Sequence, residues 1–243
     1  SNKLVSEKKN MFQRRILGLV SYYLGSTPDL YAKKEFIHVN LEMDPYHLQI
    51  YNYYEDIERK LERKAAISRT QSNVYRSYTR QASNFVFPSL GNKVDGENRP
   101  RPGQFRLTEQ EIDKLEEGVK LEKEKKAAKK AATITALKEY TLLIKKYLIT
   151  LKNYFYGLLK KDKQKKLSLS NDVKVFLNEY KGNFNEFWNK YNKKSYTLRA
   201  LYASSCKMVG IIFNIFKSKG PVVVYSNYVK MEGLEIFRLY LEV

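Results

Sequence analysis

The feature that decides the fold is the stretch Gly220-Pro221-Val222-Val223-Val224-Tyr225-Ser226-Asn227-Tyr228, near the end of the sequence. A Gly-Pro turn leads into three valines, and residues with polar tips follow them. A short β-branched run that begins at a turn is typical of a buried parallel strand. The sequence therefore predicts a strand here that belongs to an α/β sheet.

The polar residues that end this strand are candidate ligand contacts. Ligands of open α/β sheets bind at the carboxyl ends of the strands, where Tyr225, Ser226 and Asn227 fall. Their hydroxyl and amide groups can bind a phosphate oxygen without any catalytic role. The alternative is that Ser226 and Asn227 cap the helix that follows.

Helical periodicity accounts for most of the remaining sequence. Asp44-Pro45 combines an N-cap residue with a proline at the first helical position, and it predicts a helix over residues 45–66. Its expected apolar face contains Leu48, Tyr51 and Leu61, with Tyr54 or Glu55 and Ile57 or Glu58 between them. Further helices are predicted over residues 11–24, 74–87, 172–192 and 196–217. Alternation of apolar and polar residues predicts a strand over residues 36–43.

The most regular apolar pattern lies in the middle of the chain. Steps of three and four residues separate Ile134, Leu137, Thr141, Ile144, Leu148, Leu151, Phe155 and Leu158. This spacing predicts a coiled-coil-like helix. Because the connection to residues 172–192 is short, we expect the two segments to pack as an antiparallel hairpin within the chain. The alternative is a coiled coil between two chains.

The charge of the chain points to an anionic partner. The 243 residues include 45 Lys and Arg against 26 Asp and Glu, which gives a net charge of +19. Nucleic-acid phosphate is the simplest partner, and an acidic protein or mere solubility is the alternative. Arg14, Arg15, Arg76 and Arg80 are candidate phosphate contacts, the last two four residues apart on one helical face. For Arg80, salt bridges or packing within the protein are the favoured alternative.

The sequence lacks the residues that several kinds of chemistry require. There is no Gly-x-x-x-x-Gly-Lys-Ser/Thr loop to bind ATP phosphates and no Asp-Glu-x-Asp/His box to hold magnesium, so we expect no ATPase activity from the chain alone. Cys206 is the single cysteine, and with His38 and His47 it makes a poor zinc set. The longest apolar run, residues 208–216, is about half of the ~20 residues that a membrane helix needs.

Three separated segments resemble one protein family, and they occur in the expected order. Residues 220–237, GPVVVYSNYVKMEGLEIF, resemble the start of the second RecA-like lobe, motif IV, in SNF2-like superfamily 2 helicases of large cytoplasmic DNA viruses. Residues 12–23 look like the segment that follows the last motif of the first lobe. Residues 75–88 look like the bridge before an insertion. Residues 107–196 match no family segment.

This resemblance implies an organisation and a function for the chain. The expected fold is mainly α, a helical hairpin insertion with a few strands from incomplete RecA-like lobes. Residues 1–106 would close the first lobe and form the bridge, 107–195 the insertion, and 196–243 the start of the second lobe. The first lobe would begin before Ser1, and the second would continue after Val243.

The implied parent protein is an ATP-dependent helicase or translocase, with ATP and magnesium bound outside this chain. Its implied partners are DNA or RNA, the remainder of the helicase and a viral RNA polymerase, with no membrane. It would act in viral transcription, in the host cytoplasm (the viral factory) or in the virion. The alternative is a free-standing basic helical protein that binds nucleic acid or a transcription complex.

Overall fold

A computed structural model describes residues 35–67, 77–91, 94–105, 107, 127–229 and 231–243. The chain divides into two units, residues 1–40 and 41–243. In the first unit the described residues, 35–40, form no helix or strand and are exposed. The predicted helix over residues 11–24 lies outside the described residues. The strand predicted over residues 36–43 is wrong, since no strand pairing forms there and the neighbours Phe36 and Ile37 are both exposed.

The second unit begins with a helical pair, α2 (Pro45–Ile67) and α3 (Ser77–Asn84). The predicted N-cap of α2 is confirmed, because the backbone N–H of Tyr46 donates to Asp44 Oδ1 at 3.0 Å. The predicted buried face is confirmed in part, because Tyr54 and Glu58 are buried. Leu48 and Leu61 are exposed instead, and His47 and Ile50 are buried in addition. Glu58 is buried because its carboxylate accepts the N–H groups of Tyr78 and Thr79 at the start of α3.

Helix α3 ends at Asn84, three residues before the predicted end. Residues 85–87 instead run through the core with their side chains buried. The N–H of Val86 donates to the carbonyl of Ser204 at 2.8 Å, which ties this segment to the junction of two later helices. Tertiary packing of Phe85 and Phe87 therefore overrides local helix propensity here.

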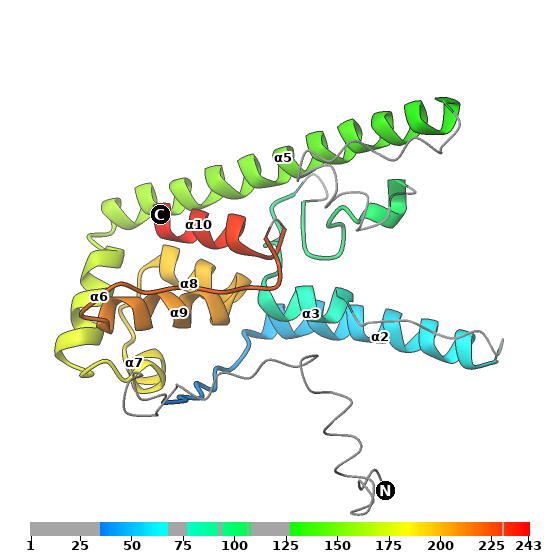
Figure 1. Cartoon of the computed structure of the whole chain (residues 1–243). Coiled ribbons are helices and arrows are strands. Elements are labelled where there is room, and N and C mark those ends of the chain that lie inside the picture. Colours follow the sequence, from blue (N-terminus) through cyan, green and yellow to red (C-terminus); the bar gives the residue numbers. More distant parts are fainter. Residues whose placement is uncertain (1–34, 68–76, 92–93, 106, 108–126, 230) are drawn as a thin grey trace, which may run out of the picture. The chain divides into compact units, whose positions relative to one another are not determined.

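The longest described helix is α5 (Ala127–Gln164), shown in green in Figure 1. Its buried face consists of Tyr140, Ile144, Tyr147, Leu151 and Phe155. This face packs within the chain, as predicted, but against different elements. It meets α8 (Tyr196–Ser204) and α10 (Leu234–Glu242) rather than residues 172–192. Figure 1 shows α10 running beside α5, and the rings of Phe155 and Tyr240 are 5.7 Å apart.

The helix predicted over residues 172–192 is two helices, α6 (Leu169–Asn178) and α7 (Phe184–Lys190). The break lies at Lys181 and Gly182, which have φ values of 49° and 74°. Asn183 then caps α7 by accepting the N–H of Glu186. A glycine in the left-handed conformation followed by a cap residue ends one helix and begins another.

The helix predicted over residues 196–217 is likewise divided, into α8 and α9 (Cys206–Lys217). Ser205 lies between them in an extended conformation, and its Oγ accepts the N–H of Met208 at 3.0 Å. At the other end of α8, Asp162 accepts the N–H groups of Tyr196 and Thr197, and Asp172 accepts that of Ser195. The two buried carboxylates thus serve as caps.

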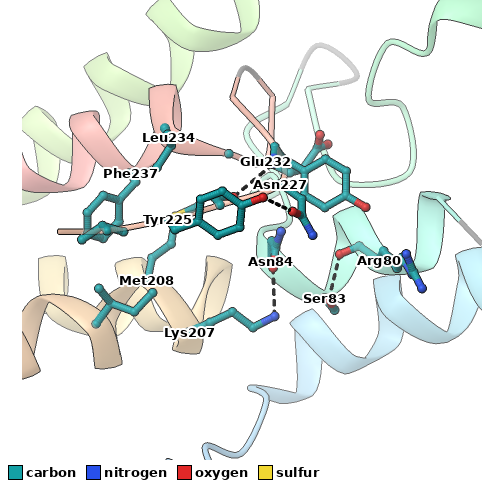
Figure 2. Close-up of a pocket in the computed structure, with 15 residues that line it drawn as sticks. Arg80, Ser83, Asn84, Lys207, Met208, Tyr225, Asn227, Glu232, Leu234 and Phe237 are labelled. Atoms are coloured by element: carbon teal, nitrogen blue, oxygen red, sulfur yellow. Dashed lines mark hydrogen bonds between the residues drawn. The ribbon is translucent and has the colours of Figure 1, made fainter. Parts of the chain in front are cut away.

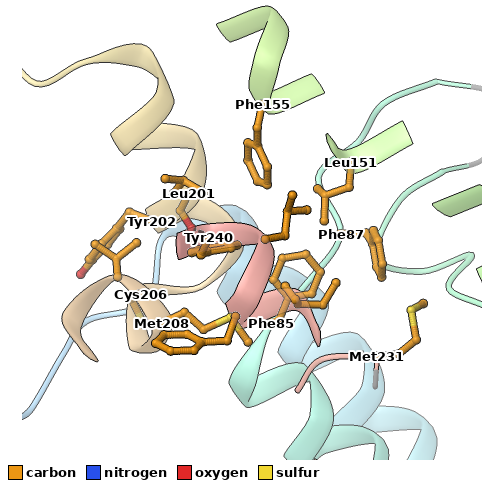
Figure 3. Packing of buried hydrophobic residues seen from close by; sticks show 14 of the residues in the cluster. Phe85, Phe87, Leu151, Phe155, Leu201, Tyr202, Cys206, Met208, Met231 and Tyr240 are labelled. Atoms are coloured by element: carbon orange, nitrogen blue, oxygen red, sulfur yellow. Dashed lines mark hydrogen bonds between the residues drawn. The ribbon is translucent and has the colours of Figure 1, made fainter. Parts of the chain in front are cut away.

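One large aromatic and aliphatic core joins these elements. Figure 3 shows Phe85 and Phe87 from the segment after α3 beside Leu151 and Phe155 of α5 and Tyr240 of α10. A smaller cluster of Ile50, Tyr54, Ala82 and Val86 holds α2 against α3. A short 3₁₀ turn, η3 (Pro102–Phe105), packs on α5 through Phe105 and Tyr140. The described residues are mainly helical, and none of their helices is long and apolar enough to cross a membrane.

The strand predicted at residues 222–228 does not form among the described residues. The segment is extended, and its side chains alternate: Val224, Ser226 and Tyr228 are partly covered, whereas Val223 and Tyr225 are 93% and 84% exposed. This alternation is typical of an extended segment, but the segment pairs with no neighbouring strand among the described residues. Since Val223 is solvent-exposed, this segment is not the buried parallel strand that the sequence predicts.

Candidate nucleic-acid interface

A pocket of about 460 Å³ lies between α3, α9, the extended segment and the start of α10. Figure 2 shows its walls. Helix α3 supplies Arg80, Ser83 and Asn84, and α9 supplies Lys207, Met208 and Ile211. The remaining wall is formed by Val224, Tyr225, Ser226, Asn227, Tyr228, Glu232, Gly233, Leu234 and Phe237. The pocket thus has an apolar floor with amide, hydroxyl and cationic groups around it.

The structure brings together four of the seven residues predicted to bind nucleic acid. Arg80, Tyr225, Ser226 and Asn227 all line this pocket, although about 145 residues of sequence separate the first from the others. Arg14, Arg15 and Arg76 lie outside the described residues. The Arg80 side chain is exposed.

The polar side chains of the extended segment are positioned by local hydrogen bonds. The hydroxyl of Tyr225 donates to Asn227 Oδ1 at 2.8 Å, and the N–H of Tyr228 donates to Ser226 Oγ at 3.1 Å. The alternative that Ser226 and Asn227 cap the following helix is wrong. The first N–H groups of α10, those of Leu234 and Glu235, donate instead to the backbone carbonyls of Tyr228 and Val229.

Gly233 allows the backbone at the start of α10 to lie this close to Tyr228 and Val229. A Cβ atom at residue 233 would lie 2.1 Å from the carbonyl oxygen of Tyr228, far inside any real contact. Only glycine therefore allows the start of α10 to approach the end of the extended segment this closely. The extended segment that forms one wall of the pocket and the start of α10 are therefore held together as one folded unit.

Beside the pocket, Glu232 forms a buried ion pair with Arg99. Both distances, from Arg99 Nε to Glu232 Oε1 and from Nη2 to Oε2, are 2.5 Å. Burial alone would lower the pKa of Arg99, but the Glu232 carboxylate outweighs it and raises that pKa. Because Arg99 neutralises Glu232, this carboxylate does not cancel the positive charge of the pocket.

Lys207 is the pocket cation with the most informative surroundings. Its Nζ donates to Asn84 Oδ1 at 2.8 Å, a contact drawn in Figure 2. Lys207 is solvent-exposed as a whole, but neighbouring protein atoms partly desolvate its ammonium group and lower its pKa. Lys207 also lies in the first turn of α9, where the helix dipole disfavours a cation. A bound anion would offset both the desolvation of the ammonium group and its unfavourable interaction with the helix dipole.

The Lys207–Asn84 pair was not among the residues predicted to bind nucleic acid. The available signal is the pair Ser204-Ser205, which is typical of a helix start and places Lys207 in a first turn. A cation there contradicts the usual charge preference, and such local contradictions mark functional positions. The contact with Asn84 spans 123 residues and cannot be read from the sequence.

No group of three His, Cys, Asp or Glu side chains that could hold a metal ion occurs within the part of the chain that the structure describes. Cys206 is buried, and burial raises the pKa of its thiol, so it has the character of a core residue and not of a nucleophile. His47 is fully buried, with Nε2 2.7 Å from the carbonyl of Ala82.

The fold and the pocket together define a basic, mainly helical protein with a polar, cationic site. No family model matches the sequence, and no solved structure is similar to it. Over 241 residues, 96% of its length, the chain is 42% identical to a protein of Acanthamoeba polyphaga mimivirus named "Putative ATP-dependent RNA helicase R350". The chain spans 28% of the length of that protein. It is thus similar to one part of a larger viral protein that carries a helicase name.

Proposed function

We propose that this chain is part of a viral ATP-dependent helicase or translocase of the SNF2-like superfamily 2 type, and that it supplies nucleic-acid contacts and the connection between two lobes. Two findings support the helicase class: the three family-like segments in the sequence and the similarity to the mimivirus protein. The proposed setting is viral transcription beside a viral RNA polymerase, in the cytoplasmic factory or the virion.

The observation that carries the nucleic-acid role is the composition of the pocket. Arg80 and Lys207 supply positive charge, and Asn84, Ser226 and Asn227 supply polar groups around the same volume. Such a set suits a phosphodiester group, because cations and small polar side chains are the usual phosphate contacts and read no sequence. The exposed ring of Tyr225 at the edge offers a surface for an unpaired base.

The extended segment 222–228 fits the same proposal. Its side chains alternate between partly covered and exposed, and its outward side chains, Val223 and Tyr225, are exposed. In the proposed complete helicase this segment would become the first strand of the second lobe, with partner strands from the remainder of that protein. ATP and magnesium would bind on those other parts.

The test uses the full-length helicase that contains this chain, with Lys207→Met and a matched exposed lysine on α6, Lys174→Met, as the control. We expect RNA-independent ATP hydrolysis to be equal in all three proteins. The RNA concentration for half-maximal stimulation should rise about five- to tenfold for Lys207→Met, the effect of losing one charged phosphate contact. An unchanged RNA requirement would contradict the proposal for the pocket.

A free-standing nucleic-acid-binding protein is the second candidate. The observation in its favour is that residues 41–243 form one compact unit around a large core. The full reading frame separates the two candidates, because only the helicase requires phosphate-binding and magnesium-binding motifs beside this chain.

A further inference from the structure

The outer face of α5 presents apolar side chains to solvent at regular spacing. Leu142, Ile149 and Tyr156 are 68%, 61% and 38% exposed. They follow one another at seven-residue intervals, which keeps them within about 40° of each other around the helix and spreads them over about 21 Å. Single exposed apolar residues need no explanation, but an aligned row on a helix marks a contact surface.

This row is distinct from the part of α5 that holds the fold together. The opposite side, with Tyr147, Leu151 and Phe155, is buried against α8 and α10. The core therefore gains nothing from Leu142 and Ile149. Helix α5 is apolar on two sides, and the described residues cover only one of them.

Lysines flank the apolar row along its whole length. On the same side of α5 lie Lys138, Lys145, Lys146, Lys152, Lys160 and Lys163, against a single exposed acidic residue, Glu139. Lys152 contacts Glu242 of α10 at 3.3 Å between Nζ and Oε2. The surface thus combines apolar anchors every two turns with positive charge, most of it on the side of Lys145, Lys152 and Lys163.

We propose that this face of α5 is a docking surface for an acidic amphipathic helix of a protein partner. Such a helix would set its own apolar row against Leu142, Ile149 and Tyr156 and place Asp and Glu opposite the lysines. The charge pattern excludes the same face of a second copy, because two chains of charge +19 would oppose lysine to lysine. Nucleic acid would match the lysines, but a phosphate backbone would leave the apolar row uncovered.

This proposal does not rest on the pocket or on a helicase function. The pocket lies between α3, α9 and α10, and none of the residues of the outer face of α5 lines it. Failure of one proposal therefore leaves the other intact.

The experiment titrates two labelled synthetic 24-residue peptides with the whole chain at physiological salt. One is helical and acidic, with leucine at heptad positions flanked by glutamate. The other has the same charge with glutamine in place of leucine. We expect micromolar binding of the first peptide and at least about tenfold weaker binding of the second, because the apolar anchors carry most of the affinity in such interfaces.

Variants of the chain locate the binding site. The double substitution Leu142→Gln/Ile149→Gln should weaken binding of the leucine peptide about tenfold, and Leu61→Gln, an exposed position on α2, should change it less than about twofold. The melting temperature should be unchanged in each case, because all three side chains are exposed. Lys145→Glu/Lys146→Glu should also weaken binding and leave melting unchanged.

Each alternative occupant of this face predicts a different experimental result, and each of these results would overturn the proposal. Equal binding of both peptides means a charge-only surface. Loss of oligonucleotide or of anionic phosphatidylserine-vesicle binding in Leu142→Gln/Ile149→Gln, with peptide binding intact, assigns the face to nucleic acid or a lipid surface. Peptide binding that emerges only after the acidic residues between 109 and 124 are replaced by glutamine means that the chain covers this face itself.

Discussion

At the scale of single residues, the pocket is defined by side chains that violate local preferences. Lys207 places a cation in the first turn of α9, and Glu232 holds a positive φ of 59° while its carboxylate is buried. Glu232 is compensated by Arg99. Lys207, in contrast, donates to a neutral amide, that of Asn84. This difference is why Lys207 is the residue whose substitution is most informative.

The first prediction concerns binding by Lys207. Lys207→Met should weaken the affinity of the chain for a single-stranded oligonucleotide and reduce the slope of log affinity against log salt by about 0.7, the value for one phosphate contact on a single strand. Titrations by fluorescence anisotropy at several salt concentrations measure both quantities. Lys174→Met, on the exposed side of α6, should change neither, and equal effects of the two variants would contradict a specific site.

The second prediction concerns pH. Partial desolvation lowers the pKa of Lys207, so this lysine loses its charge at lower pH than an ordinary lysine does. Because the folded-state pKa lies below the unfolded one, the contribution of this residue to the free energy of unfolding rises as pH rises through the folded-state value. Binding should change in the opposite direction, falling at alkaline pH as the ammonium group is lost.

Lys207→Arg is the matched variant for the pH prediction, since arginine keeps its charge throughout the alkaline range. Oligonucleotide affinity measured on raising the pH should fall earlier in the wild-type chain than in Lys207→Arg. Parallel pH curves for the two proteins would show that Lys207 does not titrate in the site.

The third prediction concerns the close approach at Gly233. Gly233→Ala should lower the free energy of unfolding by about 1–3 kcal/mol or more, because the new methyl group collides with the Tyr228 carbonyl and the neighbouring backbone must move. Gly220→Ala is the control, since a Cβ atom there has no neighbour within 4 Å. Chemical denaturation of both variants measures the difference, and similar stabilities would mean that the loop adapts without cost.

At the scale of elements, the sequence predicts helices well and their breaks poorly. The start of α2 could be predicted because Asp44-Pro45 is a local signal, and the mainly α class follows from the apolar periodicity. The division of residues 196–217 could not, because it depends on contacts with a distant part of the chain: the hydroxyl of Ser205 donates to the carbonyl of Asn84, and the N–H of Val86 donates to the carbonyl of Ser204. A serine inside an apolar helical pattern can continue the helix or end it, and which of the two occurs depends on the hydrogen-bond partner of the serine.

The packing partner of α5 could not be predicted from the sequence either. The three-four spacing correctly predicts burial of Ile144, Leu151 and Phe155. It cannot specify which apolar face they meet, since α6, α8 and α10 all offer one. The short connection favours α6, but the cap that Asp162 provides for α8 brings α8 to α5 instead.

The fourth prediction separates the two faces of α5. Leu151→Ala should cost about 2–5 kcal/mol of unfolding free energy, because Leu151 is fully buried and the substitution leaves a cavity. Ile149→Ala, two residues away and mostly exposed, should stay within about 0.5 kcal/mol. Thermal and urea denaturation of both variants test this, and comparable losses would place Ile149 in the core.

At the scale of the whole molecule, two separate signals in the sequence lead to one pocket. A basic helical face indicates Arg80 and the end of an apolar run indicates residues 225–227, and these residues line the same pocket. The predicted strand itself is unpaired, since a strand needs neighbours that local sequence does not supply. Lys207 and Asn84 complete the pocket only through tertiary folding.

The most direct test of the central claim, that this pocket binds nucleic-acid strands, is photo-crosslinking of the chain to a 4-thiouridine-containing RNA, read out by mass spectrometry. We expect crosslinks concentrated at Tyr225 and its neighbours, lost in Lys207→Met and retained in Lys174→Met. Crosslinks confined to other surfaces, such as the lysines of α5, with none in residues 224–228, would contradict it.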